Sequence, residues 1–166
     1  MLDAVGLIKK HRAKSVLIDT NLLVLYLVGS TNKNRIPTFK RTQVYTIEDF
    51  ELLQGLIAYL GDVITTPHVL TEVSNLANLH EPELRSFRQH FKSAVVGMVE
   101  FCDASREVVS DGSFQRLGLT DAAIALISRH NHLVLTDDLT LEITLHRRGV
   151  DAINFNHIRA SNWTLR

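Results

Sequence analysis

Acidic residues stand where the apolar pattern of this chain changes from strand to helix. Asp19 directly follows the apolar run at residues 16–18, and Asp137 and Asp138 directly follow the run "HLVLT". Asp121 falls in the first turn of a predicted helix that leads into that second run. Because the carboxyl ends of parallel strands meet at one edge of a sheet, where ligands bind, we expect these carboxylates to lie close together.

Glu72 is a further acidic residue in an unusual place. In "TPHVLTEVSNLANL" helical spacing puts it on the same stripe as Val69, Leu76 and Leu79. A carboxylate that faces inward is costly unless it is paired or binds a metal ion. A buried ion pair with an arginine, or a position at the edge of the stripe, would also explain it.

Several carboxylates that share one pocket cannot all ionise without compensation. A bound Mg²⁺ or Mn²⁺ provides that compensation, because these ions prefer oxygen ligands. The chemistry indicated is metal-assisted hydrolysis of a phosphodiester. We assign Asp19 as a direct ligand of the ion. Further ligands, directly or through water, are Asp121, Asp137 and Asp138. Glu72 would bind a second ion or orient the attacking water. For Asp121 and for one of the adjacent pair, helix capping, typically worth ~0.5–2 kcal/mol, is the alternative.

The elements that must position these residues alternate between strand and helix. Such alternation predicts an α/β fold in which a parallel sheet is covered by helices on both faces. Residues 30–45 are polar and basic and predict a loop. We expect strands at 16–19, 63–66, 132–136 and 151–155, helices at 22–28, 47–60, 67–79, 81–101, 120–129 and 139–148, and a short extended piece at 105–110.

Composition limits the class of protein. The 166 residues, 45% of them hydrophobic, suit a single domain over residues 1–166. No apolar run approaches the ~18 residues of a transmembrane helix, so no membrane association is expected. The single cysteine, Cys102, excludes an internal disulfide and suits a reducing, cytoplasmic setting; we expect it to be a small core residue.

The ordered set of acidic motifs resembles the PIN domain family. The matching segments are "LIDTNLL", "TPHVLTEVSNL", "LTDAAIAL" and "LVLTDDLTL", which together cover roughly residues 15–155. The resemblance implies a three-layer α/β/α sandwich with a central parallel sheet of four or five strands. It also implies a Mg²⁺- or Mn²⁺-dependent nuclease that acts mostly on single-stranded RNA. The residues it assigns to catalysis are Asp19, Glu72, Asp121 and Asp138, with Asp137 as an alternative for the last, and Asn21 and Thr136 as supporting residues.

Many PIN proteins resemble VapC-type toxins, which pair with an antitoxin. In those toxins the glutamate follows soon after the first aspartate, whereas here a loop and a helix are inserted at about 30–61. Despite this insertion, the resemblance implies an endoribonuclease. The protein partner that it implies is an antitoxin or a second copy of the chain. Two alternatives are a toxin-like subunit that acts mainly through protein–protein interaction and a nuclease of flap type directed at DNA.

Basic residues cluster in two segments, residues 31–42 and residues 9–14, of a chain whose formal net charge is zero. A local cluster can bind phosphate even when the total charge is neutral, although a solvated surface is the alternative. Phe39 and Tyr45, beside the first cluster, are candidates for stacking on bases. The predicted nucleic-acid-binding residues are Lys33, Arg35, Lys40 and Arg41 in the loop, and Arg85, Arg88 and Lys92 on the helix at 81–101.

Overall fold

A five-stranded, entirely parallel sheet forms the centre of the molecule in the computed structural model, which describes residues 3–160 and all of their side chains except that of Arg129. The strand order is β3-β2-β1-β4-β5. In register, Val16 of β1 pairs with Val63 of β2 on one side and with Leu133 of β4 on the other. The strands are β1 (Lys14–Ile18), β2 (Gly61–Thr65), β3 (Val99–Glu100), β4 (Leu133–Thr136) and β5 (Ala152–Asn154).

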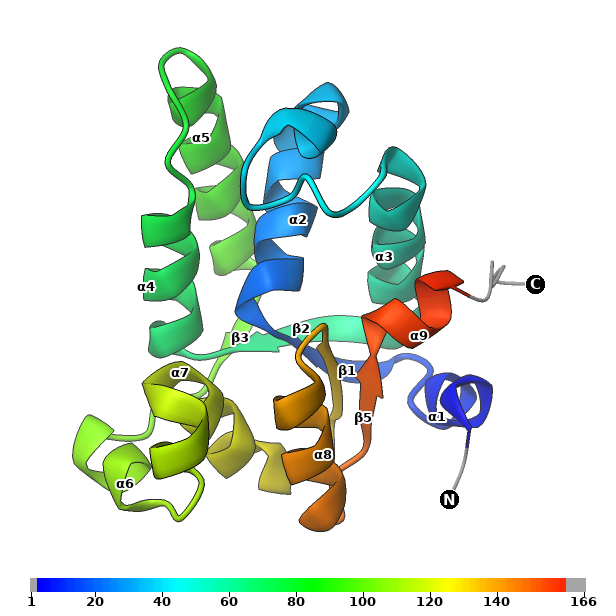
Figure 1. Cartoon of the computed structure of the whole chain (residues 1–166), viewed down its shortest axis with the longest axis vertical. Helices are drawn as coiled ribbons and strands as arrows, with labels where there is room; N and C mark the ends of the chain where they lie inside the picture. Colours follow the sequence, from blue (N-terminus) through cyan, green and yellow to red (C-terminus); the bar gives the residue numbers. More distant parts are fainter. Residues whose placement is uncertain (1–2, 161–166) are drawn as a thin grey trace.

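Helices cover both faces of this sheet, as the alternating sequence pattern predicts (Figure 1). One side carries α2, α3, α4 and α5, and the other carries α6, α7 and α8 (Figure 1). The structure is thus the predicted three-layer α/β/α sandwich. The helices are α1 (Ala4–Lys10), α2 (Thr20–Thr31), α3 (Ile47–Leu60), α4 (Pro67–Leu76), α5 (Glu83–Val96), α6 (Ser105–Ser110), α7 (Phe114–Ile127), α8 (Leu139–Arg147) and α9 (Phe155–Ala160), with 3₁₀ turns η1 (Lys33–Thr38) and η2 (Ser128–His130).

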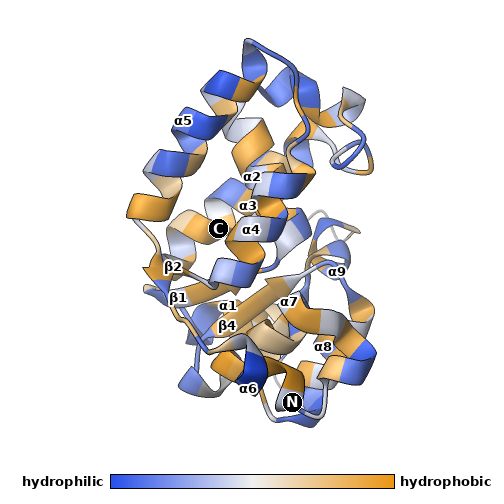
Figure 2. Ribbon diagram, turned by 90° about the vertical axis from the view of Figure 1, so that its left-hand side faces the viewer, coloured by the Kyte–Doolittle hydropathy of each residue, from blue (hydrophilic) through white to orange (hydrophobic). Residues whose placement is uncertain are grey.

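The core lies on both sides of the two central strands. Val16, Leu17 and Ile18 of β1 are at most 1% exposed, and all four residues of β4 are buried. Figure 2 shows these strands and much of α2 as hydrophobic, whereas α5 is mostly hydrophilic along its outer length. Strands covered on both faces read as continuous apolar runs, which explains why β1 and β4 are so visible in the sequence.

Local signals fix several of the helix boundaries. Thr46 and Asp49 form a reciprocal capping box at the start of α3, and the Thr66 hydroxyl accepts the Val69 N–H at the start of α4, where Pro67 is the first residue. Within residues 3–160 none of the helices combines the length and the apolar composition needed to span a bilayer.

Some expectations from the sequence are wrong. Residues 105–110 form α6 and not an extended segment, and Cys102 is exposed and not a core residue. The helix predicted at 81–101 ends at Val96 and is followed by the short edge strand β3. The helix predicted from 120 begins at Phe114 but is broken at Gly118, whose φ of 79° and ψ of −177° are open essentially only to glycine.

The inserted segment packs closely against α2. Gly29 is buried in the last part of α2, and a Cβ added there would overlap the ring of Phe50 on α3. Phe50 is only 1% exposed, so the ring has little room to move. The absence of a side chain at residue 29 therefore sets how near α3 approaches α2.

We predict that Gly29→Ala lowers the free energy of unfolding by about 1–3 kcal/mol, because overpacking outweighs the better helix propensity of alanine. Gly112→Ala is the matched control, since a Cβ there meets nothing within 4 Å. Urea denaturation of both variants measures the difference. Equal stability of the two variants would contradict the close packing of α3 on α2.

Candidate acidic site

Asp19 is the most buried carboxylate of the predicted set, at 4% exposed. It caps α2 at the end of β1, where its Oδ1 accepts the Leu22 N–H at 3.2 Å. Its Oδ2 accepts the Thr136 hydroxyl and the Asp137 N–H, the latter at 3.1 Å. Burial, and then the charge of Asp137, raise the pKa of Asp19 well above its usual value despite these three donors.

The adjacent aspartates after β4 have different roles. The Asp138 side chain caps α8 by accepting the N–H groups of Thr140 and Leu141, and it is exposed. The Asp137 side chain points instead toward α2, where the Asn21 amide donates to its Oδ1 at 3.2 Å. The capping alternative for one member of the pair therefore describes Asp138, and Asp137 is the one in contact with the Asp19 region.

Asp121 lies within reach of three other carboxylates. Burial raises its pKa to about 7, and the charges of Asp138, Glu72 and Asp137 contribute in that order. Glu72 is half-buried on α4 and lines a cavity between α4 and α7. This half-buried position suits a place at the edge of the apolar stripe, within electrostatic reach of Asp121.

The fold explains why these residues meet. The strand order reverses between β1 and β4, because β2 and β3 lie on one side of β1 whereas β4 and β5 lie on the other. In open parallel sheets such a switch point forms a crevice at the carboxyl ends of the strands. Asp19 leaves β1 and Asp137 leaves β4 at this crevice, where the Asp19 N–H donates to the Leu135 carbonyl of β4 at 3.0 Å.

The acidic residues gather, but they do not form a finished ligand set. Among residues 3–160, no three histidine, cysteine, aspartate or glutamate side chains are arranged so that they could hold a metal ion as they stand. The Asp19 oxygens are engaged with protein donors, and Asp138 is engaged in capping. The arrangement is a concentration of carboxyl groups at a crevice, contributed by Asp19, Glu72, Asp121, Asp137 and Asp138.

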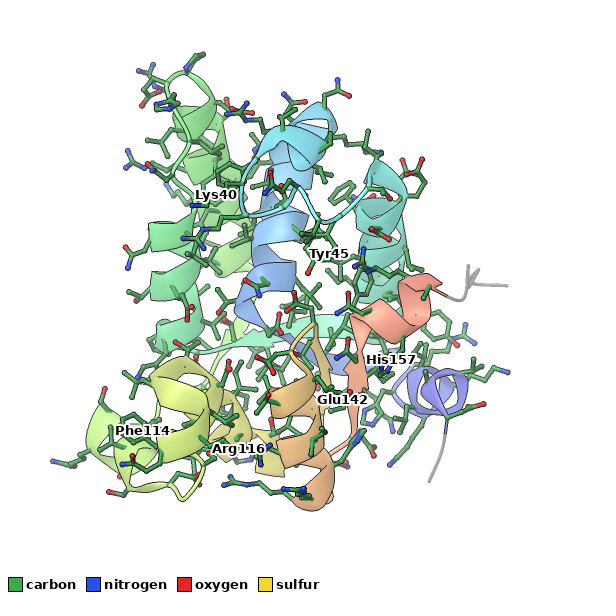
Figure 3. All side chains as sticks on the ribbon, viewed as in Figure 1. Lys40, Tyr45, Phe114, Arg116, Glu142 and His157 are labelled. Carbon is green, nitrogen blue, oxygen red and sulfur yellow. The ribbon has the colours of Figure 1, made fainter. Side chains whose placement is uncertain are left out.

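A tyrosine from the inserted segment reaches this site. The Tyr45 hydroxyl donates to Asp137 Oδ2 at 2.5 Å, and the side chain is 3% exposed. Figure 3 shows Tyr45 between α2 and α3, on the side of the loop that precedes α8. Burial and the Asp137 carboxylate raise the pKa of Tyr45 far above its usual value, so it stays a donor. The stacking roles predicted for Tyr45 and Phe39 are wrong, because both side chains are buried.

Arg159 of α9 holds Tyr45 in place. Its guanidinium carbon lies 5.2 Å from the centre of the Tyr45 ring, and its Nη1 donates to Val44 O and Asp49 Oδ2, both at 3.1 Å. Asn156, which accepts from Arg159 Nε, donates to the Asp137 carbonyl at 3.1 Å. No short motif in the sequence indicates this arrangement, because Tyr45 lies far along the chain from Asn156 and Arg159.

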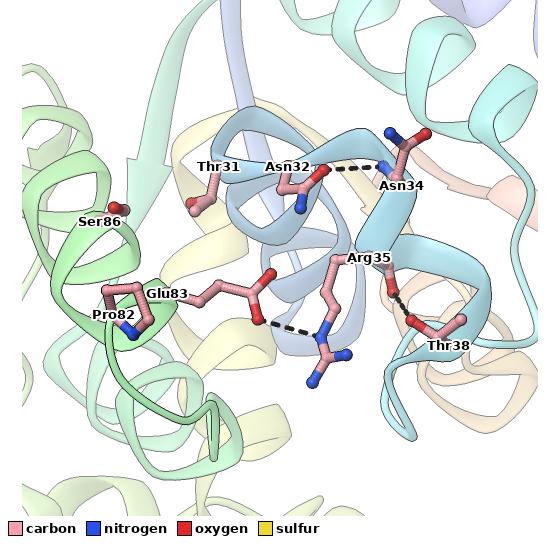
Figure 4. Close-up of a pocket in the computed structure, with 8 residues that line it drawn as sticks. All are labelled: Thr31, Asn32, Asn34, Arg35, Thr38, Pro82, Glu83 and Ser86. Carbon is pink, nitrogen blue, oxygen red and sulfur yellow. Dashed lines mark hydrogen bonds and ion pairs between the residues drawn. The ribbon is translucent and has the colours of Figure 1, made fainter.

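The predicted basic residues divide into paired and free groups. Lys33 pairs with Glu51 at 2.8 Å, and Arg35 pairs with Glu83 at 3.1 Å across a polar cavity of about 500 Å³ (Figure 4). Arg85 lies 3.8 Å from Glu81. Within the described part of the chain, the exposed side chains of Lys40, Arg41, Arg88 and Lys92 have no ion pair.

We predict that Asp121→Asn stabilises the metal-free protein at pH 8 relative to the wild type, and not at pH 4. The folded protein holds the Asp121 proton up to about pH 7, whereas the usual pKa is 3.8, so wild-type stability falls as the pH rises between these values. Urea denaturation in EDTA at pH 4, 6 and 8 measures this trend. Asp62→Asn, at an exposed position of β2, is the control; a pH-independent difference between Asp121→Asn and the wild type would contradict the crowding of charge at Asp121.

We predict that Tyr45→Phe lowers the free energy of unfolding by about 1.5 kcal/mol, because it removes a hydrogen bond to a charged acceptor while Asn21 continues to donate. Tyr59→Phe serves as control, since its hydroxyl makes no hydrogen bond within residues 3–160. Thermal denaturation compares the two variants. A loss in Tyr45→Phe no larger than that in Tyr59→Phe would show that the contact with Asp137 does not form.

Comparison with known proteins adds no family to this description. No model of a known protein family matches the chain. A search of curated proteins likewise gives no match. The functional interpretation therefore depends on the residues and geometry of the acidic site itself.

Proposed function

We propose that the chain is a Mg²⁺- or Mn²⁺-dependent endoribonuclease of PIN type, which hydrolyses phosphodiester bonds of single-stranded RNA. The observation that carries the proposal is the gathering of carboxylates from four chain segments at the switch point of the sheet. Burial there, together with the neighbouring carboxylates, raises the pKa of Asp19 and Asp121. The five parallel strands also fall within the number that the PIN resemblance implies.

The donor set suits a hard divalent cation. All charged groups that act on Asp121 are carboxylates, so a cation would relieve their repulsion. Asp121, Glu72 and Asp137 are the side chains that would hold it, with Asp19 behind them, while Asp138 contributes its charge from the start of α8. No three of these side chains are ready as a ligand set, so a cation held directly by three of them would require at least one to move, whereas one or two carboxylates with waters can also hold Mg²⁺. A bound cation would lower the pKa of a water molecule attached to it and would neutralise negative charge at the phosphoryl group.

The protein's own groups prepare the reaction. Tyr45 and Asn21 orient the Asp137 carboxylate through their hydrogen bonds. Asp121 holds a proton near neutral pH, because burial and then its negative neighbours raise its pKa, and it gives the proton up when positive charge arrives. Glu72 accepts a hydrogen bond from the attacking water in this proposal, since it has its carboxylate at the cavity wall.

The RNA backbone would meet the exposed basic residues. Lys40, Arg41, Arg88 and Lys92 are exposed and contact phosphates in this proposal. Lys33 and Arg35 contribute less, because Glu51 and Glu83 already neutralise them. Figure 2 agrees with a hydrophilic outer face on α5, the helix of Arg88 and Lys92.

A protein partner is the second candidate. Val44 and Leu139 are 64% and 55% exposed, and they adjoin Tyr45 and Asp138 in the sequence. An antitoxin or a second copy of the chain that covered these side chains would also block the acidic crevice. Such a partner would regulate the nuclease, so this candidate adds to the nuclease proposal and does not replace it.

We predict that the purified chain cleaves a single-stranded RNA oligonucleotide in Mn²⁺, but not in EDTA and not when the same sequence is DNA. Asp19→Asn and Asp121→Asn should each reduce the cleavage rate by at least ~10²-fold, the size typical of a lost group that acts directly in catalysis. Gel analysis of end-labelled oligonucleotides measures both effects.

Circular dichroism must show that each variant is folded, and Asp62→Asn, an exposed carboxylate outside the crevice, should cleave at the wild-type rate. Cleavage that resists EDTA, or that survives both substitutions unchanged, would refute the proposal. Preferential cleavage of the DNA oligonucleotide would assign the chain to the DNA-directed alternative.

A further inference from the structure

A cavity of about 320 Å³ lies beside the acidic crevice, between α4 and α7. These two helices lie side by side in the structure (Figure 1). Glu72 belongs both to the cavity wall and to the carboxylates that act on Asp121, and Thr120 on the opposite wall directly precedes Asp121. Any ligand in this cavity is therefore a direct neighbour of the acidic site.

The cavity wall selects a neutral ligand with polar edges. It contains the hydroxyls of Thr71 and Thr120 and the amide of Asn75, but no lysine or arginine. Its one formal charge, on Glu72, is negative, so a phosphate group is disfavoured. Hydrogen-bonding groups set among apolar walls are the usual lining of a small-molecule site, and 320 Å³ is near the lower end of the ~300–1,000 Å³ range of such sites.

Apolar and aromatic side chains on the cavity wall suit a flat ring. Leu119 is 38% exposed and Pro67 is half-buried, and both line the cavity. The His68 ring also lines it and lies 3.4 Å from Ser105 Oγ through Nε2. The break at Gly118, with its positive φ, starts a new helical segment at Leu119 and so places this wall opposite α4.

We propose that this cavity binds one base of the RNA, that of the nucleotide next to the cleaved bond. The proposal deepens the proposed nuclease function and rests on it. Asn75 offers one donor and one acceptor to the base edge, the pairing that amide side chains make with adenine. Leu119 and His68 contact the faces of the base. Another cavity, at Arg35 and Glu83, shares no lining residue with the acidic site, and we assign it no such role.

Nucleotide binding without any divalent cation provides the first test. Two-dimensional ¹H–¹⁵N NMR spectra of the full chain in EDTA should show that AMP shifts the signals of Thr71, Leu119, Thr120 and the Asn75 side-chain amide, whereas ribose 5-phosphate does not. Asn75→Ala should weaken AMP binding about 3- to 10-fold, the loss expected for one or two hydrogen bonds. Asn78→Ala, an exposed asparagine outside the cavity, should bind as the wild type does. Shifts that are equal for ribose 5-phosphate, or AMP binding that is unchanged in Asn75→Ala, would overturn the proposal.

Cleavage kinetics provide the second test and separate this inference from the nuclease proposal. Asn75→Ala should raise KM about 3- to 10-fold with a smaller change in kcat, and it should weaken the base preference at the nucleotide beside the cut. An active nuclease whose KM and base preference do not change in Asn75→Ala would overturn the base site alone. A chain that binds AMP at Asn75 but cleaves no nucleic acid would refute the nuclease and retain a base-binding cavity.

Discussion

Repulsion among carboxylates held at one edge of the sheet is the constraint on which the rest of this site depends. The strand order brings the ends of β1 and β4 together, so Asp19 and Asp137 cannot separate without disrupting the sheet. The fold compensates Asp19 with three neutral donors, one from α2, one from Thr136 at the end of β4 and one from Asp137 directly after it. Asp121 receives no such compensation and responds through a raised pKa. A site that retains this electrostatic cost is typical of a functional centre, because burial and like charges are otherwise avoided.

The inserted segment supports the acidic site through Tyr45, in addition to presenting the exposed Lys40 and Arg41 to solvent. The close approach of α3 to α2 at Gly29 fixes the path of the chain that carries Tyr45, and Arg159 joins that path to α9. Two hydrogen bonds, from Tyr45 and from Asn156, then reach Asp137 from the insertion and from the end of the described chain. The orientation of one carboxylate thus depends on segments that are distant in sequence, which explains why a large insertion is compatible with a precise site.

The sequence predicts the parts of the structure that local pattern controls. Buried strands such as β1 and β4 have continuous apolar runs, and the meeting of their carboxyl ends made the position of Asp19 and Asp137 predictable. The sequence wrongly predicts an extended segment at residues 105–110, because the β-branched pair Val108 and Val109 favours extended structure on its own, whereas Val108 packs against Ala122 and Ala123. The roles of Tyr45 and of the cavity at Asn75 depend on tertiary packing, and the choice between Asp137 and Asp138 depends on which side chain caps α8. None of these three features leaves a periodic signal in the sequence.

The central claim is that the gathered carboxylates form a cation site, and direct titration of Mn²⁺ tests it without any substrate. Isothermal titration calorimetry at pH 7 in two buffers of different ionisation enthalpy measures both the affinity and the protons released. The account predicts that Mn²⁺ binds the wild type with release of protons, since Asp121 is partly protonated at this pH. Asp121→Asn should bind at least ~10-fold more weakly, a loss of 1.4 kcal/mol, and release fewer protons. Absence of Mn²⁺ binding, or equal binding by Asp121→Asn, would contradict the account.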